Sequence, residues 1–169
     1  MAESITEATL NDIYPQYKVL REAKKGFAYP TKEHNAEKAI DQLSICASQG
    51  LNFIAKKDLR IVGCMVLCYD QLWFSDESFL VDLAYYIDPK ARKSSLAVRL
   101  LDLAKKKARE LGLPLHMSVT YGTDVERKEK FFLRQGFEKI GGNYLLRLSL
   151  DHDSEQRIYR VFRAFPLQE

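Results

Sequence analysis

The chain has 169 residues, the usual size of one domain with a single substantial core. Its 26 Lys and Arg exceed its 23 Asp and Glu, and the resulting net charge of +3 is too mild to indicate nucleic acid or an anionic membrane as the partner. The first residues lack a basic segment followed by an apolar run, and no stretch has the length of a membrane span. We therefore expect a soluble, cytoplasmic protein in which any anion binding is local.

Two segments near the N-terminus have the apolar spacing of helices, residues 8–24 and 32–49. The second segment carries apolar side chains at steps of three and four: Ala36, Ile40, Leu43 and Ala47. Gly50 is expected to end it, because glycine readily adopts the left-handed conformation that follows many helices. The intervening residues 26–31, GFAYPT, are expected to form a loop.

From residue 52 the apolar spacing changes to that of strands, over residues 52–56, 61–70 and 78–88. The second and third of these runs are dense enough in apolar residues for the centre of a sheet. Pro89 ends the third run, because its ring removes a backbone donor from the ladder.

Three cysteines, Cys46, Cys64 and Cys68, form an odd set without CxxC spacing, which is typical of reduced thiols inside a cell. Cys64 and Cys68 would lie on one face of a strand, roughly 13 Å apart, too far to share a metal ion. The histidines show no paired metal-ligand spacing. The sequence therefore predicts core packing for the cysteines and no metal site.

Residues 94–111 have the clearest helical pattern. Apolar side chains recur at every fourth position: Leu96, Leu100, Ala104 and Ala108. The basic side chains are expected to face mainly solvent: Lys105, Lys106, Lys107 and Arg109. Gly112 and Pro114 are expected to end this helix.

Residues 115–121 are expected to form another strand. Thr123 with Glu126 would make a capping box for a helix that runs to about Gln135. Gly136 follows as the expected stop.

A final strand pair is expected over residues 137–140 and 143–150, turning about two glycines. The element order is typical of an α/β layered fold with a largely antiparallel beginning. We expect one domain over residues 1–150. Residues 151–169 would form an extension that packs on this domain or makes a dimer contact.

Basic residues gather in the turn between the strand ending at Ile87 and the helix starting near Ser94: Lys90, Arg92 and Lys93. The first amides of a helix lack intrahelical partners and the helix dipole is positive there, so this turn suits a phosphate. Alternatively, Ser94 is an N-cap and the basic residues belong to a solvated turn. Both interpretations remain open from these features.

Residues 87–97, IDPKARKSSLA, resemble the acetyl-CoA signature of the GNAT superfamily of N-acetyltransferases. That signature is a strand with an apolar end, x-Pro, and then Arg/Gln-x-x-Gly-x-Gly/Ala opening a long helix. Arg92 matches the first position and Ala97 the last, while Ser95 stands where the middle glycine is usual.

A second segment, FFLRQGF at residues 131–137, resembles the family's helix that ends in an aromatic residue, three residues and Gly-Phe. IVG at residues 61–63 is similar to a common strand start in the family. The resemblance covers roughly residues 50–150, and it looks most like small family members encoded by phages.

The resemblance implies a mixed central sheet flanked by helices, and acetyl-CoA bound on residues 90–97. It implies transfer of the acetyl group to a primary amine by direct attack in a ternary complex. The expected coenzyme contacts are Tyr85, Tyr86, Ile87, Arg92, Lys93, Ser94, Ser95, Leu96, Ala97 and Phe132. The first three would pair with the pantetheine arm through their backbone groups.

Two departures from the family pattern bear on activity. Ser95 replaces a glycine that lets the backbone approach the pyrophosphate, so we expect weakened or altered coenzyme binding. Phe132 stands where the family often has a tyrosine that protonates the departing thiolate, and phenylalanine cannot donate. Tyr121, Tyr144 or a water would substitute, since a thiolate needs little acid help.

Asp82 is the first candidate for the general base, because a lone acid in an apolar strand is costly unless it has a partner or a function. Its alternative is an outward side chain on a half-exposed face. His116 is the second candidate, with a structural role as its alternative. Glu77 in the preceding loop, or a water chain, are further options.

Aromatic residues are dense in residues 69–79 and 26–30, which resemble loops that line the acceptor side in the family. Trp73, Phe74 and Tyr29, with Glu77 nearby, would grip an acceptor. Alternatively they cap the core or form a dimer patch.

The sequence thus predicts an N-acetyltransferase whose acceptor is a small-molecule or protein amine. The alternative is a non-catalytic interaction module of the same fold, supported by Ser95 and Phe132. A module that binds nucleic acid or other polyanions through the basic turn ranks last, because the net charge is small. A homodimer is left open.

Overall fold

A computed structural model describes residues 2–23, 34–119 and 124–142 of the chain. The expected loop at 26–31 and the expected strand at 143–150 lie outside the described residues.

The chain divides into two compact units, Met1–Lys139 and Ile140–Glu169. Only residues 140–142 of the second unit are described, so the expected domain boundary after residue 150 and the packing of the extension stay predictions.

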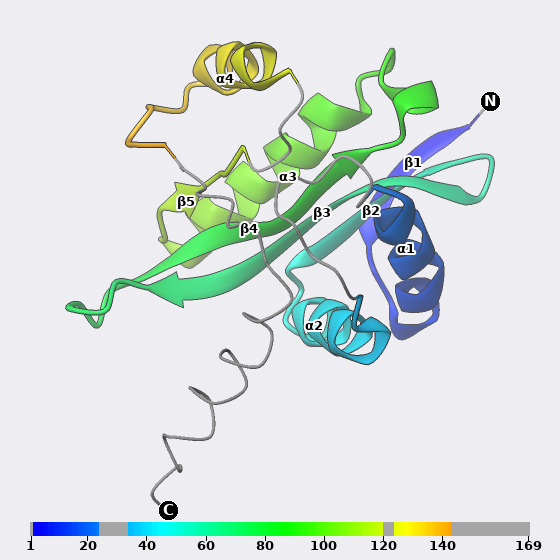
Figure 1. The fold of residues 1–169 in the computed structure, drawn as a ribbon, viewed down its shortest axis with the longest axis horizontal. Helices are drawn as coiled ribbons and strands as arrows, with labels where there is room; N and C mark the ends of the chain where they lie inside the picture. The colour runs from blue at the N-terminus through cyan, green and yellow to red at the C-terminus, as the bar shows by residue number, and fades with distance from the viewer. Residues whose placement is uncertain (1, 24–33, 120–123, 143–169) are drawn as a thin grey trace, which may run out of the picture. The chain divides into compact units, whose positions relative to one another are not determined.

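Within the described residues, five strands form one sheet in the order β1-β2-β3-β4-β5 (Figure 1). Their bounds are β1 Glu3–Glu7, β2 Asn52–Lys57, β3 Arg60–Gln71, β4 Ser78–Ile87 and β5 Leu115–His116. The pairs from β1 to β4 are antiparallel, and β5 joins β4 in parallel. The mixed sheet with an antiparallel beginning is confirmed.

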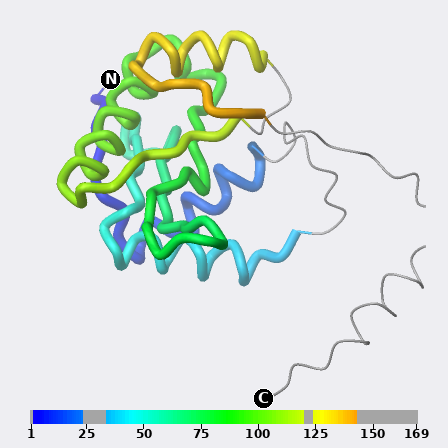
Figure 2. Tube along the Cα trace, turned by 90° about the vertical axis from the view of Figure 1, so that its left-hand side faces the viewer, coloured from blue at the N-terminus to red at the C-terminus, as the bar shows by residue number. Residues whose placement is uncertain are grey.

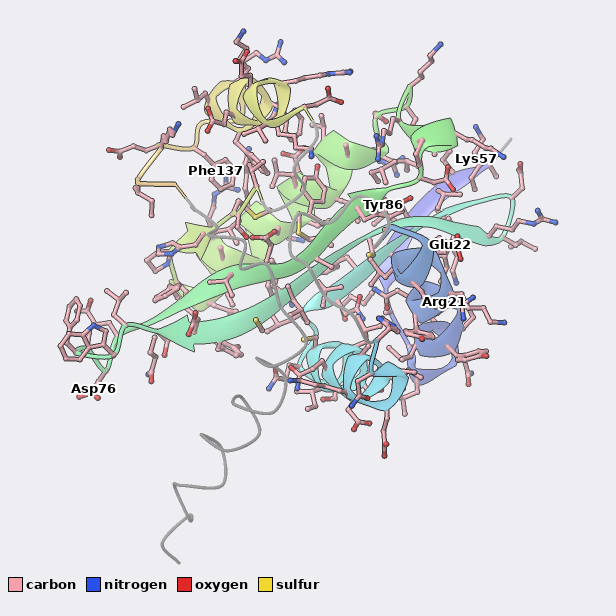
Figure 3. All side chains as sticks on the ribbon, in the orientation of Figure 1. Arg21, Glu22, Lys57, Asp76, Tyr86 and Phe137 are labelled. Carbon is pink, nitrogen blue, oxygen red and sulfur yellow. The ribbon has the colours of Figure 1, made fainter. Side chains whose placement is uncertain are left out.

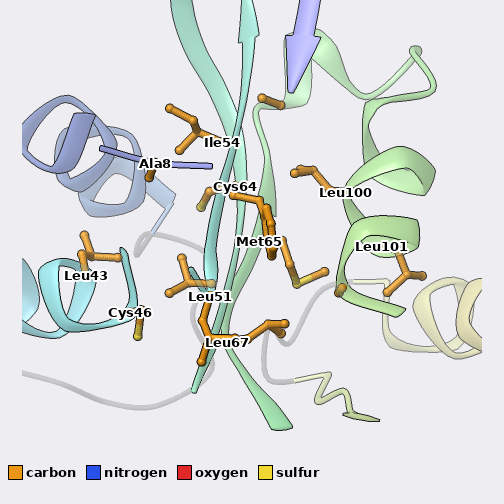
Figure 4. Packing of buried hydrophobic residues seen from close by; sticks show 14 of the residues in the cluster. Ala8, Leu43, Cys46, Leu51, Ile54, Cys64, Met65, Leu67, Leu100 and Leu101 are labelled. Atoms are coloured by element: carbon orange, nitrogen blue, oxygen red, sulfur yellow. The ribbon is translucent and has the colours of Figure 1, made fainter. Parts of the chain in front are cut away.

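The part of the chain that the structure describes has four helices flanking the sheet: α1 Leu10–Ala23, α2 Ala36–Ser48, α3 Leu96–Leu111 and α4 Val125–Arg134. Helices α1 and α2 lie on one face of the sheet and α3 lies on the other, as the close view of the core shows (Figure 4). The end of α4 lies close to α3, as the trace seen from the side shows (Figure 2) and as the hydrogen bond from Lys105 to Gln135 requires. This arrangement of helices on both faces confirms the predicted α/β class.

The core lies on both sides of β2, β3 and β4 (Figure 4). Its largest fully buried apolar side chains are Leu51, Ile54, Met65, Leu67, Leu80, Leu96, Leu100 and Leu101. The apolar stripe predicted for residues 94–111 is buried as expected, because the repeat at every fourth position keeps one face of α3 against the sheet.

Two of the three cysteines, Cys46 and Cys64, are buried in this core. Burial raises the pKa of the Cys46 thiol to about 11 and that of the Cys64 thiol to about 12. The half-buried Cys68 also has a raised pKa, chiefly through burial. The predicted packing role of the cysteines is confirmed, since these thiols stay protonated.

Strand β1 was not predicted. Its sequence, ESITE, has Ile5 as its sole apolar residue, so it lacks the apolar alternation that marks a strand. The strand forms at the edge of the sheet because β2 offers it a complete row of backbone partners, from Glu3 opposite Lys57 to Glu7 opposite Phe53.

Some predicted element bounds differ from the structure. Helix α3 begins at Leu96, two residues after the predicted start at Ser94, and Ser95 is in its cap position. Helix α4 begins at Val125 with Asp124 in the cap position, and Thr123 of the predicted capping box lies outside the described residues. Residues 137–140 are not assigned to a strand, and their predicted partner, residues 143–150, lies outside the described residues.

The basic face of α3 also differs from the prediction. Lys105 and Lys107 are half-buried, whereas Lys106 and Arg109 are exposed as expected. Lys105 extends over α4, where Nζ donates to the carbonyl oxygen of Gln135 at 2.7 Å.

Candidate functional site

Strand β4 has one edge that is only partly paired. Its pairing with β5 consists of Leu80 opposite Leu115 and Val81 opposite His116. From residue 82 to its end at Ile87, the edge that faces away from β3 has no strand partner in the part of the chain that is described. The backbone groups along this edge are therefore available to an extended ligand.

Asp82 lies where β4 and β5 separate. Its Oδ1 accepts hydrogen bonds from the backbone N–H of Ser118 at 2.7 Å and from the Ser118 hydroxyl at 2.9 Å. The carboxylate takes the N–H that a longer β5 would have given to the ladder. This explains why the strand predicted over residues 115–121 ends at His116.

The Asp82 carboxyl is half-buried, and burial raises its pKa to about 6 against the lowering effect of the Ser118 hydrogen bonds. A carboxyl with this pKa exchanges protons near neutral pH, which is what a general base requires. Ser118 was not predicted as a site residue. The sequence feature that could have indicated Ser118 is its position as a polar residue in the otherwise mostly apolar strand segment LHMSV.

His116 occupies the last paired position of β5. Its ring stacks on Phe79, with centroids 4.2 Å apart and planes at 26°. Among the described residues it makes no hydrogen bond with Asp82. The stacked position supports the structural alternative for this histidine.

The turn after β4 folds closely against the strand end. Residues Pro89–Ala91 form a 3-10 turn, and Asp88 caps it by accepting from the N–H of Lys90 at 2.8 Å. Arg92 folds back so that Nε donates to the carbonyl oxygen of Ile87 at 3.1 Å. The first signature residue is thus held at the end of the open edge.

Backbone donors gather where this turn enters α3. Within the described residues, no hydrogen bond is made by the N–H groups of Lys93, Ser95, Ala97 and Val98. These donors lie beside the exposed side chains of the basic turn. The combination of orphan amides, helix dipole and basic side chains suits a phosphate group.

Two serines occupy this helix start in different ways. Ser94 donates its hydroxyl to the carbonyl oxygen of Ala91 at 2.7 Å and accepts a long 3.4 Å contact from the N–H of Leu96. Ser95 is exposed, and its φ of −78° and ψ of 0° belong to the right-handed region. That conformation is open to any residue, so the backbone here does not require the usual glycine.

The remaining residues predicted to bind the coenzyme include buried apolar side chains and two tyrosines. Ile87 and Leu96 are buried, so that only their backbone groups can contact a ligand. The Tyr85 hydroxyl donates to the carbonyl oxygen of Ala97 at 2.7 Å and ties β4 to the first turn of α3. Tyr86 is half-buried, and burial raises the pKa of its phenol.

Phe132 lies in an aromatic cluster. Its ring centroid is 5.5 Å from those of Phe131 and Phe137, and 6.2 Å from that of Tyr85. The ring packs α4 against the sheet, which agrees with a structural role for this residue.

Trp73, Phe74 and Glu77 lie in the loop at residues 72–77 that joins β3 to β4. Ser78 is four residues from Asp82 along β4, about 13 Å at the usual rise per residue. This loop is therefore remote from Asp82 and from the basic turn. The other predicted site residues, Tyr29, Tyr121 and Tyr144, lie outside the described residues.

Over residues 2–23, 34–119 and 124–142, no group of three or more His, Cys, Asp or Glu side chains is placed to hold a metal ion. None of the helices in that same part of the chain has both the length and the apolar character that crossing a membrane requires.

The acetyltransferase (GNAT) family model matches residues 10–137, and the chain belongs to this family. The family uses acetyl-CoA as its co-substrate. No curated protein matches the chain by sequence.

Solved structures share the fold. A predicted acetyltransferase from Clostridium acetobutylicum, determined with acetyl-CoA, has a TM-score of 0.70 at 12% identity, over 86% of this chain and 96% of that one. A ribosomal-protein-alanine N-acetyltransferase from Brucella melitensis biovar Abortus has a TM-score of 0.62 at 16% identity, and the match covers 88% of this chain and 100% of that one. Glucosamine-6-phosphate N-acetyltransferase from Arabidopsis thaliana has a TM-score of 0.65 at 11% identity, and the match covers 88% of this chain and 100% of that one. At these identities the likeness shows the fold.

Proposed function

We propose that this protein is an acyl-CoA-dependent N-acetyltransferase that binds acetyl-CoA on residues 90–97 and acetylates a primary amine. One observation carries the proposal: the open edge of β4 leads directly into a basic turn with four backbone N–H groups that find no partner among the described residues. An extended arm with a phosphate group at one end matches both features.

In this proposal the turn binds the pyrophosphate of the coenzyme. The N–H groups of Lys93, Ser95, Ala97 and Val98 donate to its oxygens, and Arg92 and Lys93 add positive charge. The hydroxyl of Ser95 is exposed and adds a further donor. The residues present therefore fit the coenzyme, even though Ser95 replaces the usual glycine.

The backbone of Tyr85, Tyr86 and Ile87 would bind the pantetheine arm as an additional strand along the open edge. Acetyl-CoA supplies an activated acetyl group to the acceptor amine. Asp82 accepts the proton that this amine loses, because its carboxylate lies at the point where the two strands separate.

Acid catalysis does not come from Phe132, which has no proton to donate. The thiol of the coenzyme leaves as a thiolate with little help, since a free thiol has a pKa of about 8.5. Tyr121 and Tyr144 stay predicted donors. His116 stays a predicted second base, although its stacking on Phe79 favours a structural role.

The acceptor is a small-molecule or protein amine. Among the structural neighbours, one is named for a ribosomal-protein alanine and another for glucosamine 6-phosphate. Tyr29 stays a predicted acceptor contact. We place the protein in the cytoplasm, because its three cysteines, Cys46, Cys64 and Cys68, are free thiols, as is usual in a reducing compartment.

A titration with acetyl-CoA and with CoA tests the binding site. Calorimetry should show saturable binding by the wild type, and Arg92→Ala should weaken it by about tenfold or more, because a charged contact to phosphate is lost. Arg109→Ala is the matched control, since Arg109 is an exposed arginine at the far end of α3. Absence of binding by the wild type, or equal loss in both variants, would contradict the proposed site.

Release of CoA thiol in the presence of candidate amines separates an enzyme from the non-catalytic module. The enzyme should release CoA with an amine, and kcat/KM should rise with pH through about 6 as Asp82 ionises. Asp82→Asn should lower this rate and leave the affinity for CoA unchanged. CoA binding with no thiol release for any amine class would favour the interaction module.

A further inference from the structure

The end of β3 and the loop between β3 and β4 expose large apolar side chains. Trp73 is 94% exposed, Phe74 67%, Leu72 47% and Tyr69 45%. We call these four residues the hairpin patch. Figure 3 labels Asp76 in this loop, which extends beyond the body of the sheet. Contiguous apolar exposure of this kind marks interaction surfaces in soluble proteins.

Hydrogen bonds within the loop hold its backbone in place. Gln71 donates through Nε2 to the carbonyl oxygen of Asp76 at 3.0 Å and to the Ser78 hydroxyl at 3.1 Å. The N–H of Ser75 donates to the carbonyl oxygen of Leu72 at 3.0 Å. The loop is thereby pre-organised without burying its aromatic side chains, which lowers the entropy lost when a partner binds.

The two most exposed rings form one unit beside a hollow. Trp73 and Phe74 meet edge to face with centroids 5.3 Å apart and planes at 87°. An open hollow runs along the loop between Tyr69 and Ser78. Rigid aromatic side chains next to a concave surface are typical anchor points of protein interfaces.

The charge around the patch has one sign. Residues 69–79 contain Asp70, Asp76 and Glu77 but no Lys, Arg or His, in a chain whose net charge is +3. In the described part of the chain, none of these three carboxylates forms an ion pair. A complementary surface therefore carries positive charge as well as apolar groups.

We propose that the hairpin patch docks a basic segment of a partner protein that also carries apolar side chains. The apolar side chains cover Trp73 and Phe74, and Lys or Arg side chains reach the carboxylates and the aromatic ring faces. A small amine cannot cover four side chains at once. The loop is about 13 Å or more from Asp82 along β4, so a docked segment and the coenzyme would occupy separate places on the protein.

Trp73 is the only tryptophan of the chain, so intrinsic fluorescence reports directly on this surface. The probe is a short synthetic peptide of alternating lysine and leucine, titrated into the full-length protein without coenzyme. The expected result is a saturable blue shift of the emission that weakens as salt is added. A matched peptide of alternating glutamate and leucine should leave the emission unchanged.

Two variants keep the reporter and test the patch. Phe74→Ser should weaken peptide binding by about tenfold or more, because one aromatic anchor is lost. Tyr14→Ser removes an exposed aromatic side chain from α1 and should leave binding unchanged. Since both side chains are exposed, circular dichroism should confirm that both variants keep the fold.

Four results would overturn the proposal: no shift with the lysine–leucine peptide, equal affinity for the glutamate–leucine peptide, unchanged binding by Phe74→Ser, or the same saturable shift with spermidine alone. A blue shift of the emission that grows with protein concentration in the absence of peptide would also overturn it, because it would show that a second copy of this chain covers the hairpin patch. Failure of coenzyme binding would leave this test unaffected, because the fluorescence titration contains no coenzyme.

Discussion

Asp82 experiences two opposing effects at the separation of β4 and β5. Burial raises the pKa of its carboxyl to about 6, while two hydrogen bonds from Ser118 lower it. The folded protein therefore holds this proton in a pH range where the unfolded chain, with an aspartate pKa near 3.8, has lost it. As a result, the free energy of unfolding contributed by this group falls as pH rises from about 4 to about 6.

Asp82→Asn should remove this fall, because an amide does not titrate. The free energy of unfolding, measured by chemical denaturation at several pH values between 4 and 7, should lose the part of its pH slope that Asp82 supplies. The same slope in both proteins would contradict the burial of this carboxyl.

Ser118→Ala is the companion variant. It removes the hydroxyl bond to Asp82 and leaves the backbone N–H in place, so the pKa of the carboxyl should rise further. The pH range of the stability loss should then extend upward. A shift to lower pH would contradict the assignment of the hydroxyl as a donor to Asp82.

Lys105 connects α3 to the end of α4. Its Nζ donates to the carbonyl oxygen of Gln135, which follows the last residue of α4, and lies 5.6 Å from the centroid of the Phe137 ring. Terminal carbonyls of a helix have no partner inside the helix, and a lysine at that end also favours the helix dipole. This contact holds the helix that carries Phe132.

Lys105→Met should therefore loosen α4 selectively, with a loss of about 1–2 kcal/mol in local stability. Hydrogen exchange should become faster for the amides of Val125–Arg134 while those in the middle of α3 keep their protection. Lys106→Met is the control, because Lys106 is exposed and its ion pair among the described residues is with Glu110 of its own helix, at 3.7 Å. Equal exchange in both variants would rule out the connecting role.

At the scale of the whole molecule, one buried polar pair joins the N-terminal helices to the sheet. Gln16 on α1 donates to Asn52 on β2 at 2.8 Å, and Asn52 donates back at 2.9 Å. Asn52 also contacts the carbonyl oxygen of Leu43 on α2 at 3.3 Å. Both amides are fully buried, so their hydrogen-bonding groups depend on each other.

Gln16→Leu should lower the free energy of unfolding by about 1–3 kcal/mol, because it leaves the buried Asn52 amide without its partner. Replacing Asn52 by leucine as well should cost less than the two single changes added together. Gln42→Leu, at an exposed position of α2, should be close to neutral. Strict additivity of the two changes in denaturation experiments would show that the amides act separately.

Local sequence determined much of this protein. The apolar repeat of α3, the dense apolar runs of β3 and β4, and the proline after Ile87 act through neighbouring residues along the chain, so their structures follow from spacing alone. The signature in residues 87–97 likewise indicated the family, and the family model confirms it. The turn and the helix start lie within one or two residues of their predicted positions.

The tertiary structure decided the features that need contacts between distant residues. Strand β1 exists because β2 pairs with it, and β5 is short because Asp82 takes the N–H of Ser118, 36 positions away. Neither a carboxylate's partner nor a loop's exposure is encoded by its immediate neighbours. The proton affinity of Asp82 and the solvent exposure of Trp73 depend on which parts of the chain fold against them, and that is a property of the packed molecule.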